Sequence, residues 1–134
     1  MTPVDQEFIH DPDNGVYGDC QRAVIASLMD LPLVEVPHFL RDAKGHTHTF
    51  FKLLQTFCLF KGYVYATSRG APLLTYGASD IAVYHEIAGM SPRGVYHAVV
   101  ACNGEIVHDP HPSRAGLIGA PNEWEYSYLI SVKK

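Results

Sequence analysis

The sequence predicts a single α+β domain over residues 1–134, in which helices come first and an antiparallel β-sheet meander follows. Two observations support this fold class. Runs of helix-forming residues lie in residues 20–60, whereas short segments rich in β-branched and aromatic residues, separated by turn residues, lie in residues 63–130. A length of 134 residues is typical of one domain with one core.

The first helix is expected over residues 20–29, CQRAVIASLM, which contain neither Gly nor Pro. It follows a segment rich in Asp, Pro, Gly and Asn that predicts a loop over residues 1–19. Asp19 stands where an N-cap residue is expected, so Cys20 falls in the first turn. Pro32 ends the helix because proline disfavours helical backbone in the residue before it.

A short helical turn and a loop are predicted over residues 33–45, and a buried helix over residues 50–60. Beyond Gly62 the spacing of apolar residues changes to the alternation of strands. The Asn103-Gly104 dipeptide predicts a type I′ hairpin, because both of its residues readily adopt positive φ. The predicted strands cover residues 63–67, 81–88, 95–101, 105–107 and 124–130.

Charge and composition exclude several classes of protein. The net charge is −4, which differs from the basic footprint of a nucleic-acid binder. No stretch is long and apolar enough to predict a membrane span, and the first 15 residues lack the pattern of a signal peptide. Three widely spaced cysteines are a poor disulfide framework, so we expect reduced thiols and a cytoplasmic setting.

Three residues form a candidate catalytic set. Cys20 lies at a helix start, where free amides and the helix dipole are expected to stabilise a thiolate. His97 lies within the strongest predicted strand and would act as the base. Asp109 lies about as far after the Asn103-Gly104 turn as His97 lies before it, so the hairpin brings it near the imidazole. Asn14 and the Cys20 amide are candidate donors to an oxyanion.

The order of these residues resembles papain-like cysteine peptidases, which place Cys at the start of a central helix, then His, then Asn or Asp. It is most similar to the group that cuts double-glycine leader peptides from bacteriocins. The matching segments are Asn14, Asp19-Cys20, His97-Ala98-Val99-Val100 and Asp109-Pro110. The longer pattern SPRG…HAVV…EIVHDPHPSRAGL is also similar to small phage and bacterial proteins.

This sequence departs from the leader-peptidase pattern in two positions. Asn14 stands where the family has Gln, and Gln21 stands where those peptidases usually have Gly. These 134 residues also lack a transporter domain, so the resemblance does not imply leader processing. It implies a papain-like fold and a Cys-His-Asp triad acting through a thioester.

Other candidate residues have simpler interpretations. Cys58 and Cys102 lie in apolar runs and are expected in the core. His85 is a rival base without a carboxylate at a matching offset. The clusters around His46, His48, His108 and His111 lack a standard spacing of metal ligands, so no metal is predicted. Arg93 and Arg114 flank the predicted site, where they would bind a substrate carboxylate or phosphate or simply face solvent.

The leading hypothesis is a thiol hydrolase that cleaves an amide, peptide or isopeptide bond of a peptide or protein and needs no cofactor. Acyl transfer from the same thioester to an amine is the second hypothesis, and a catalytically idle binding module is the third. The sequence predicts neither nucleic acid nor membrane as a partner, and it leaves the oligomeric state open. Substrate specificity is expected from the loops at residues 33–48, 68–80 and 110–122.

Overall fold

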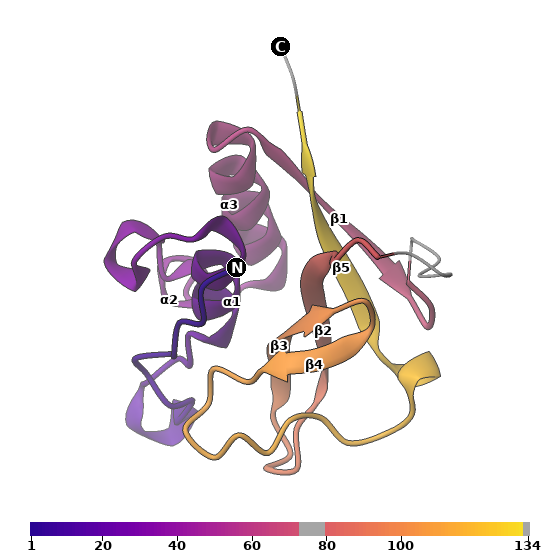
Figure 1. The fold of residues 1–134 in the computed structure, drawn as a ribbon. Helices are drawn as coiled ribbons and strands as arrows, with labels where there is room; N and C mark the ends of the chain where they lie inside the picture. Colours follow the sequence, from indigo (N-terminus) through magenta and orange to yellow (C-terminus); the bar gives the residue numbers. More distant parts are fainter. Residues whose placement is uncertain (73–79, 133–134) are drawn as a thin grey trace.

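The computed structural model describes residues 1–72 and 80–132, so part of the expected specificity loop at residues 68–80 lies outside the described residues. The described part is a mixed α+β structure with helices in its first half and a five-stranded antiparallel sheet in its second half (Figure 1). Its elements are α1 (Cys20–Met29), α2 (Phe39–Asp42), α3 (Thr47–Phe60), β1 (Tyr63–Arg69), β2 (Tyr84–Met90), β3 (Tyr96–Cys102), β4 (Glu105–His108) and β5 (Glu125–Ser131).

The sheet has the order β1-β5-β2-β3-β4, so the predicted meander is correct only for β2, β3 and β4. The last strand, β5, inserts between β1 and β2. It pairs with β1 along seven residues, from Tyr63 opposite Ser131 to Arg69 opposite Glu125. A turn dipeptide such as Asn103-Gly104 indicates only which neighbouring strands pair, and this insertion joins strands that are far apart in sequence.

Helix α1 has the predicted bounds and packs against β2 and β3 through small side chains. Val24 lies in one buried cluster with Ala88, Ala98 and Val100. Because alanines occupy the facing strand positions, the helix backbone lies close to the sheet, and Cys20 packs at the edge of the same cluster. Asp30 ends the helix in a left-handed conformation at φ 55°, and Pro32 follows shortly afterwards.

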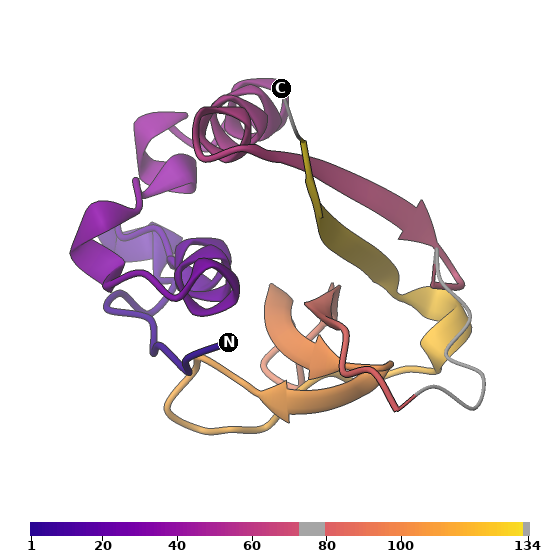
Figure 2. The ribbon, with the colours of Figure 1, turned by 45° about the horizontal axis from the view of Figure 1, so that its top comes forward.

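The helices lie together on one side of the sheet (Figure 2). Their shared core joins α1, α2 and α3 to β1, and it consists of Ile25, Ala26, Val36, Phe39, Leu54 and Cys58. A second core on the other side of β2 and β3 consists of Ile87, Val99, Ala101, Tyr126 and Tyr128. Cys58 is therefore buried as predicted, whereas Cys102 is only partly buried at the end of β3.

No single helix within residues 1–72 and 80–132 is both long and apolar enough to cross a membrane. One pair of helical segments, Cys20–Met29 with Leu33–Asp42, meets these criteria by length and composition only, and it is bent by 103°.

Candidate active site

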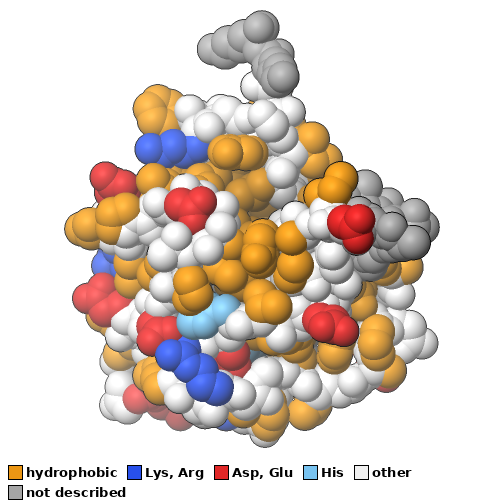
Figure 3. Space-filling model, in the orientation of Figure 1, with side chains coloured by type: hydrophobic (Ala, Val, Ile, Leu, Met, Phe, Trp, Pro, Cys, Tyr) orange, Lys and Arg blue, Asp and Glu red, His pale blue; other side chains and the backbone are white. Residues whose placement is uncertain are grey.

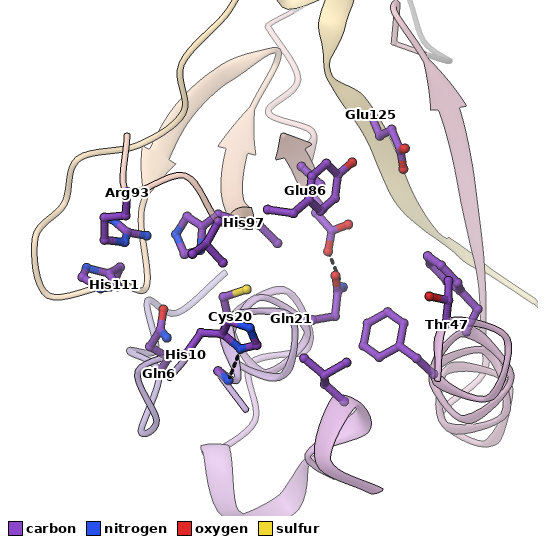
Figure 4. Close-up of a pocket in the computed structure, with 18 of the residues that line it drawn as sticks. Gln6, His10, Cys20, Gln21, Thr47, Glu86, Arg93, His97, His111 and Glu125 are labelled. Carbon is purple, nitrogen blue, oxygen red and sulfur yellow. Dashed lines mark hydrogen bonds between the residues drawn. The ribbon is translucent and has the colours of Figure 1, made fainter. Parts of the chain in front are cut away.

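Cys20 is the first residue of α1 and lines a cleft of about 800 Å³ between the helices and the sheet (Figure 4). Hydrophobic side chains gather between these two parts on the face shown in Figure 3. The cleft is lined by apolar residues that include Ile9, Leu40, Phe50, Phe51 and Val95, and by a set of polar residues near Cys20. The arrangement therefore offers a thiol to a ligand that lies in the cleft.

The predicted helix cap at Asp19 is wrong. Asp19 precedes the helix, but its buried carboxylate does not accept an amide of α1. Its Oδ1 accepts the backbone N–H of Glu7 at 3.0 Å and of Phe8 at 2.8 Å, and its Oδ2 lies 3.3 Å from Arg22 Nη1. Asp19 thus binds the N-terminal segment beside α1. Because it does not cap the helix, the Cys20 N–H forms no hydrogen bond within the described residues.

The thiol of Cys20 is not activated in the way that its helix position predicts. Burial raises its pKa to about 11, and the charges of Glu86 and Asp19 act in the same direction. Hydrogen bonds from the backbone of Ala98 and Gln21 oppose this increase only in part. This direction is opposite to the thiolate stabilisation expected from the helix start, because loss of hydration is the largest effect on the thiol.

His97 and Asp109 form a buried pair. His97 Nε2 lies 2.7 Å from Asp109 Oδ1, and the side chains are each 4% exposed. Burial lowers the pKa of His97, the Arg93 charge also lowers it, and Asp109 compensates in part. The Asp109 pKa is lowered as well, because hydrogen bonds from His97, His111 and Gly116 outweigh its burial. A neutral His97 that donates from Nε2 to this carboxylate keeps Nδ1 as a base.

A β-bulge brings this pair to one face of the sheet. Asn103 and Gly104 form the predicted turn, with φ values of 48° and 85°. Cys102 pairs with Glu105 and Ala101 with Ile106, but Val100 then pairs with His108. Without that shift, Asp109 would continue the ladder opposite Ala98 and face away from His97, since residues directly opposite share a face. With it, Asp109 falls opposite Val99, on the face of His97.

Cys20 and His97 line the same cleft and lie next to one another in the close-up (Figure 4). The described residues include no hydrogen bond between the Cys20 sulfur and the imidazole, so thiol and base are neighbours without a preformed ion pair. The low pKa of His97 and the high pKa of Cys20 both favour the neutral forms at neutral pH.

Asn14 does not belong to this site. It is exposed in a 3₁₀ turn, Pro12–Asn14, and its amide donates to Asp11 Oδ2 at 2.6 Å. Two amide side chains line the cleft, Gln6 and Gln21, and Gln21 donates to Glu86. The backbone N–H of Gln6 donates to Pro110 O at 3.1 Å, and its Nε2 donates to Phe8 O at 2.7 Å. Its Oε1 is buried without a partner in the described part of the chain. Spacing along the chain could not identify Gln6, because the N-terminal segment folds back across the site.

Glu86 is a second functional candidate that the sequence did not indicate. It lies on β2, is 1% exposed, and accepts hydrogen bonds from Gln21 Nε2 and the Tyr65 hydroxyl. Burial raises its pKa to about 7, and these hydrogen bonds limit the rise. Glu86 lines the cleft and thereby connects α1, β1 and β2, with Gln21 of α1 and Tyr65 of β1 as its partners.

The other expected candidates lie apart from the thiol or have structural partners. His85 stacks on Tyr128 with 4.8 Å between the rings and accepts the Gly104 N–H at 3.0 Å. Arg114 forms a bidentate ion pair with Asp5, in which Nη1 lies 2.6 Å from Oδ1 and Nη2 lies 2.8 Å from Oδ2. Across residues 1–72 and 80–132, no group of three or more His, Cys, Asp or Glu side chains is arranged to hold a metal ion.

Comparison of the chain with protein-family models, with curated proteins and with solved structures found no match. The chemistry of the site therefore follows from its geometry alone. A cleft holds a cysteine at a helix start, and a neutral histidine oriented by a buried carboxylate lies beside it. Such a set can transfer a proton from the thiol and return it to a leaving group.

Proposed function

We propose that this chain is a papain-like cysteine hydrolase that cleaves an amide, peptide or isopeptide bond. The observation that carries the proposal is that Cys20 faces the same cleft as His97, whose Nε2 is held 2.7 Å from Asp109. The order of a Cys-bearing helix followed by a sheet with His and Asp adds support. The proposal includes the cytoplasmic setting expected from the sequence.

The proposed reaction starts from a neutral thiol and a neutral imidazole. His97 Nδ1 removes the thiol proton as Cys20 Sγ attacks the carbonyl carbon. The C–N bond then breaks, and the leaving nitrogen takes the proton from His97, which leaves a thioester on Cys20. Water attacks this thioester while His97 accepts one of its protons. The C–S bond breaks, a carboxylic acid leaves, and the proton returns to the sulfur.

The oxyanion needs donors that are already in place. The Cys20 N–H is one donor, because no other described group uses it. We assign the second role to the Gln6 amide in place of Asn14. Gln6 lines the cleft and Asn14 does not, and the Nε2 group of Gln6 has a second N–H besides the one that it donates to Phe8 O.

Trapping an acyl-enzyme tests this proposal. The protein is incubated with a library of short N-acetylated peptides, and mass spectrometry follows both the products and the adducts at each cysteine. We expect cleavage and an acyl adduct at Cys20 with the wild-type protein. Cys20→Ala and His97→Ala should abolish both. Cys102→Ser is the matched control, because Cys102 is a partly exposed free thiol outside the cleft, and it should behave as wild type.

The alternatives predict other outcomes of the same experiment. If the thioester is resolved by amines, adding an amine acceptor yields conjugates in place of the free acid. If the chain is a binding module, no peptide is cleaved and Cys20→Ala retains peptide binding. Cleavage that persists in Cys20→Ala contradicts the hydrolase proposal.

A further inference from the structure

One end of the cleft carries a positive charge without a carboxylate partner. Arg93 lies in the turn between β2 and β3, is exposed, and lines the cleft. Its Nη1 donates to the neutral Ser113 Oγ at 2.9 Å. Within the described residues, no Asp or Glu forms an ion pair with it. Its charge reaches the site, because it lowers the pKa of both His97 and His111.

His111 adds an unused donor next to Arg93. The Ser113 N–H donates to His111 Nδ1 at 3.0 Å, so Nδ1 is an acceptor and the proton of the neutral ring lies on Nε2. Nε2 is buried, has no hydrogen-bond partner among the residues that the structure describes, and belongs to a residue that lines the cleft. A buried donor without a partner is costly, so this atom is arranged for a ligand acceptor.

The loop that holds His111 is fixed by the catalytic carboxylate. Asp109 Oδ1 accepts the His111 N–H at 2.8 Å, and Oδ2 accepts the Gly116 N–H at 2.7 Å. The ring of His111 lies 6.1 Å from that of His97, with an angle of 86° between them. The His111 ring that carries the donor is therefore held in place next to the ring of His97, the proposed base.

The place of this donor pair identifies the part of the substrate that it would contact. His97 must protonate the leaving nitrogen, so the leaving group lies beside the imidazole. Figure 4 shows Arg93 and His111 on one side of His97, and Glu86 and Glu125 on the other. In an amino acid, the carboxyl carbon is two bonds from the nitrogen. A carboxylate on the first residue after the cleaved bond would thus lie near both donors.

We propose that Arg93 and His111 form a carboxylate subsite for the leaving group, so that the substrate is a peptide or amide cleaved next to a terminal amino acid. This assignment of the leaving group rests on the proposed hydrolase function. Arginine binds carboxylates through charge-assisted hydrogen bonds, and the His111 N–H supplies a second donor from the wall of the cleft. The same positive charge opposes the entry of a cationic amine, which favours hydrolysis over transfer to lysine side chains.

Binding to the inactive Cys20→Ala variant tests the subsite separately from catalysis. The probes are N-acetylglycine and its neutral counterpart N-acetylglycinamide, and histidine NMR reports the affinity and the pKa of His111. We expect the acid to bind at least about tenfold more tightly than the amide and to raise the pKa of His111. The pKa of His111 already depends on the charges of neighbouring residues, namely Arg93, His97, Asp109 and Arg114. The comparison therefore uses one protein with two ligands, so that these charges are the same in both measurements.

Two arginine variants in the Cys20→Ala background locate the effect. Arg93→Gln should remove the preference for the acid. Arg69→Gln is the matched control, because Arg69 lines the other end of the cleft and is paired with Glu125 at 3.0 Å, and it should keep the preference. Equal binding of the two probes, no binding of either, or a preference that survives Arg93→Gln overturns the subsite. If wild-type protein forms no acyl-enzyme while the preference is present, the hydrolase proposal fails and the subsite stands.

Discussion

His97 Nε2 donates to Asp109 Oδ1 across 2.7 Å, and the same carboxylate accepts the backbone N–H groups of His111 and Gly116. One buried side chain therefore orients the proposed base and shapes the loop beside it. Each acceptor position of Asp109 faces a donor, so an amide in its place would direct its own NH₂ group toward one of these N–H groups.

Asp109→Asn should reduce both turnover and stability. We expect kcat to fall by about 10⁴-fold, since the amide cannot stabilise an imidazolium, and the free energy of unfolding to fall by about 1–3 kcal/mol. Turnover of a peptide found in the library and urea unfolding measure the two effects. Asp42→Asn is the control, because Asp42 is exposed and forms an ion pair with the exposed Arg41, and it should leave both values nearly unchanged. Unchanged turnover in Asp109→Asn would remove Asp109 from the mechanism.

The sequence predicted the helices, strands and turns well, and it predicted less well which distant segments of the chain lie next to one another. Helix Cys20–Met29 and the Asn103-Gly104 turn depend on neighbouring residues, and both agree with the structure. The prediction that Asp109 lies near His97 is also confirmed, although it counted residues from the turn and left out the bulge at Val100. A one-residue shift in strand register leaves no distinct pattern of residues in the sequence, so it could not be predicted from the sequence.

Site residues contributed by distant segments were not predictable in the same way. Gln6 reaches the cleft because Asp19 binds the amides of Glu7 and Phe8, a contact that competes with the expected helix cap. Glu86 lies on a strand whose partners come from α1 and β1. Both residues depend on tertiary packing, which the pattern of apolar and polar residues does not specify.

Gln6→Ala should weaken catalysis far more than Asn14→Ala. Loss of one oxyanion donor typically costs about 10²-fold or more in kcat, and Gln6 lines the cleft whereas Asn14 does not. Asn14 is exposed and bonds to Asp11, so its removal should leave turnover within about twofold of wild type. The comparison is made on kcat for one peptide, with folding checked by circular dichroism. A large loss in Asn14→Ala, with little loss in Gln6→Ala, would restore the assignment based on sequence spacing.

The reactivity of Cys20 should increase with pH well beyond the range of an ordinary thiol. Because burial raises its pKa to about 11, the rate of alkylation by iodoacetamide should still rise above about pH 9. Glu86→Gln should move the midpoint to lower pH, because it removes the carboxylate charge that helps to raise that pKa. Peptide mass spectrometry resolves the rates for each cysteine, with Cys102 as the internal reference. A Cys20 midpoint at or below about 8.5 would show that the helix start outweighs burial after all.

Glu86→Gln should also change how stability depends on pH. The pKa of Glu86 rises from 4.5 to about 7 on folding, so the folded protein binds more protons than the unfolded chain between these values. The favourable contribution of the protonated acid is complete below about pH 4.5 and is lost as pH rises through about 7. A shift of this size corresponds to about 3 kcal/mol. The glutamine that replaces Glu86 cannot titrate, and its amide can still accept from Gln21 and donate to Tyr65.

Urea unfolding of wild type and Glu86→Gln between about pH 5 and pH 8 measures this difference. Relative to wild type, the variant should gain stability as pH rises, by up to about 3 kcal/mol over the interval. The histidines whose pKa is lowered, such as His85 and His97, contribute in the opposite direction, but they are present in both proteins and cancel in the difference. Glu105→Gln is the control, because an exposed carboxylate is solvated in both states and should give a difference that does not vary with pH. A constant difference for Glu86→Gln as well would mean that Glu86 stays ionised in the folded protein, held by its bonds to Gln21 and Tyr65.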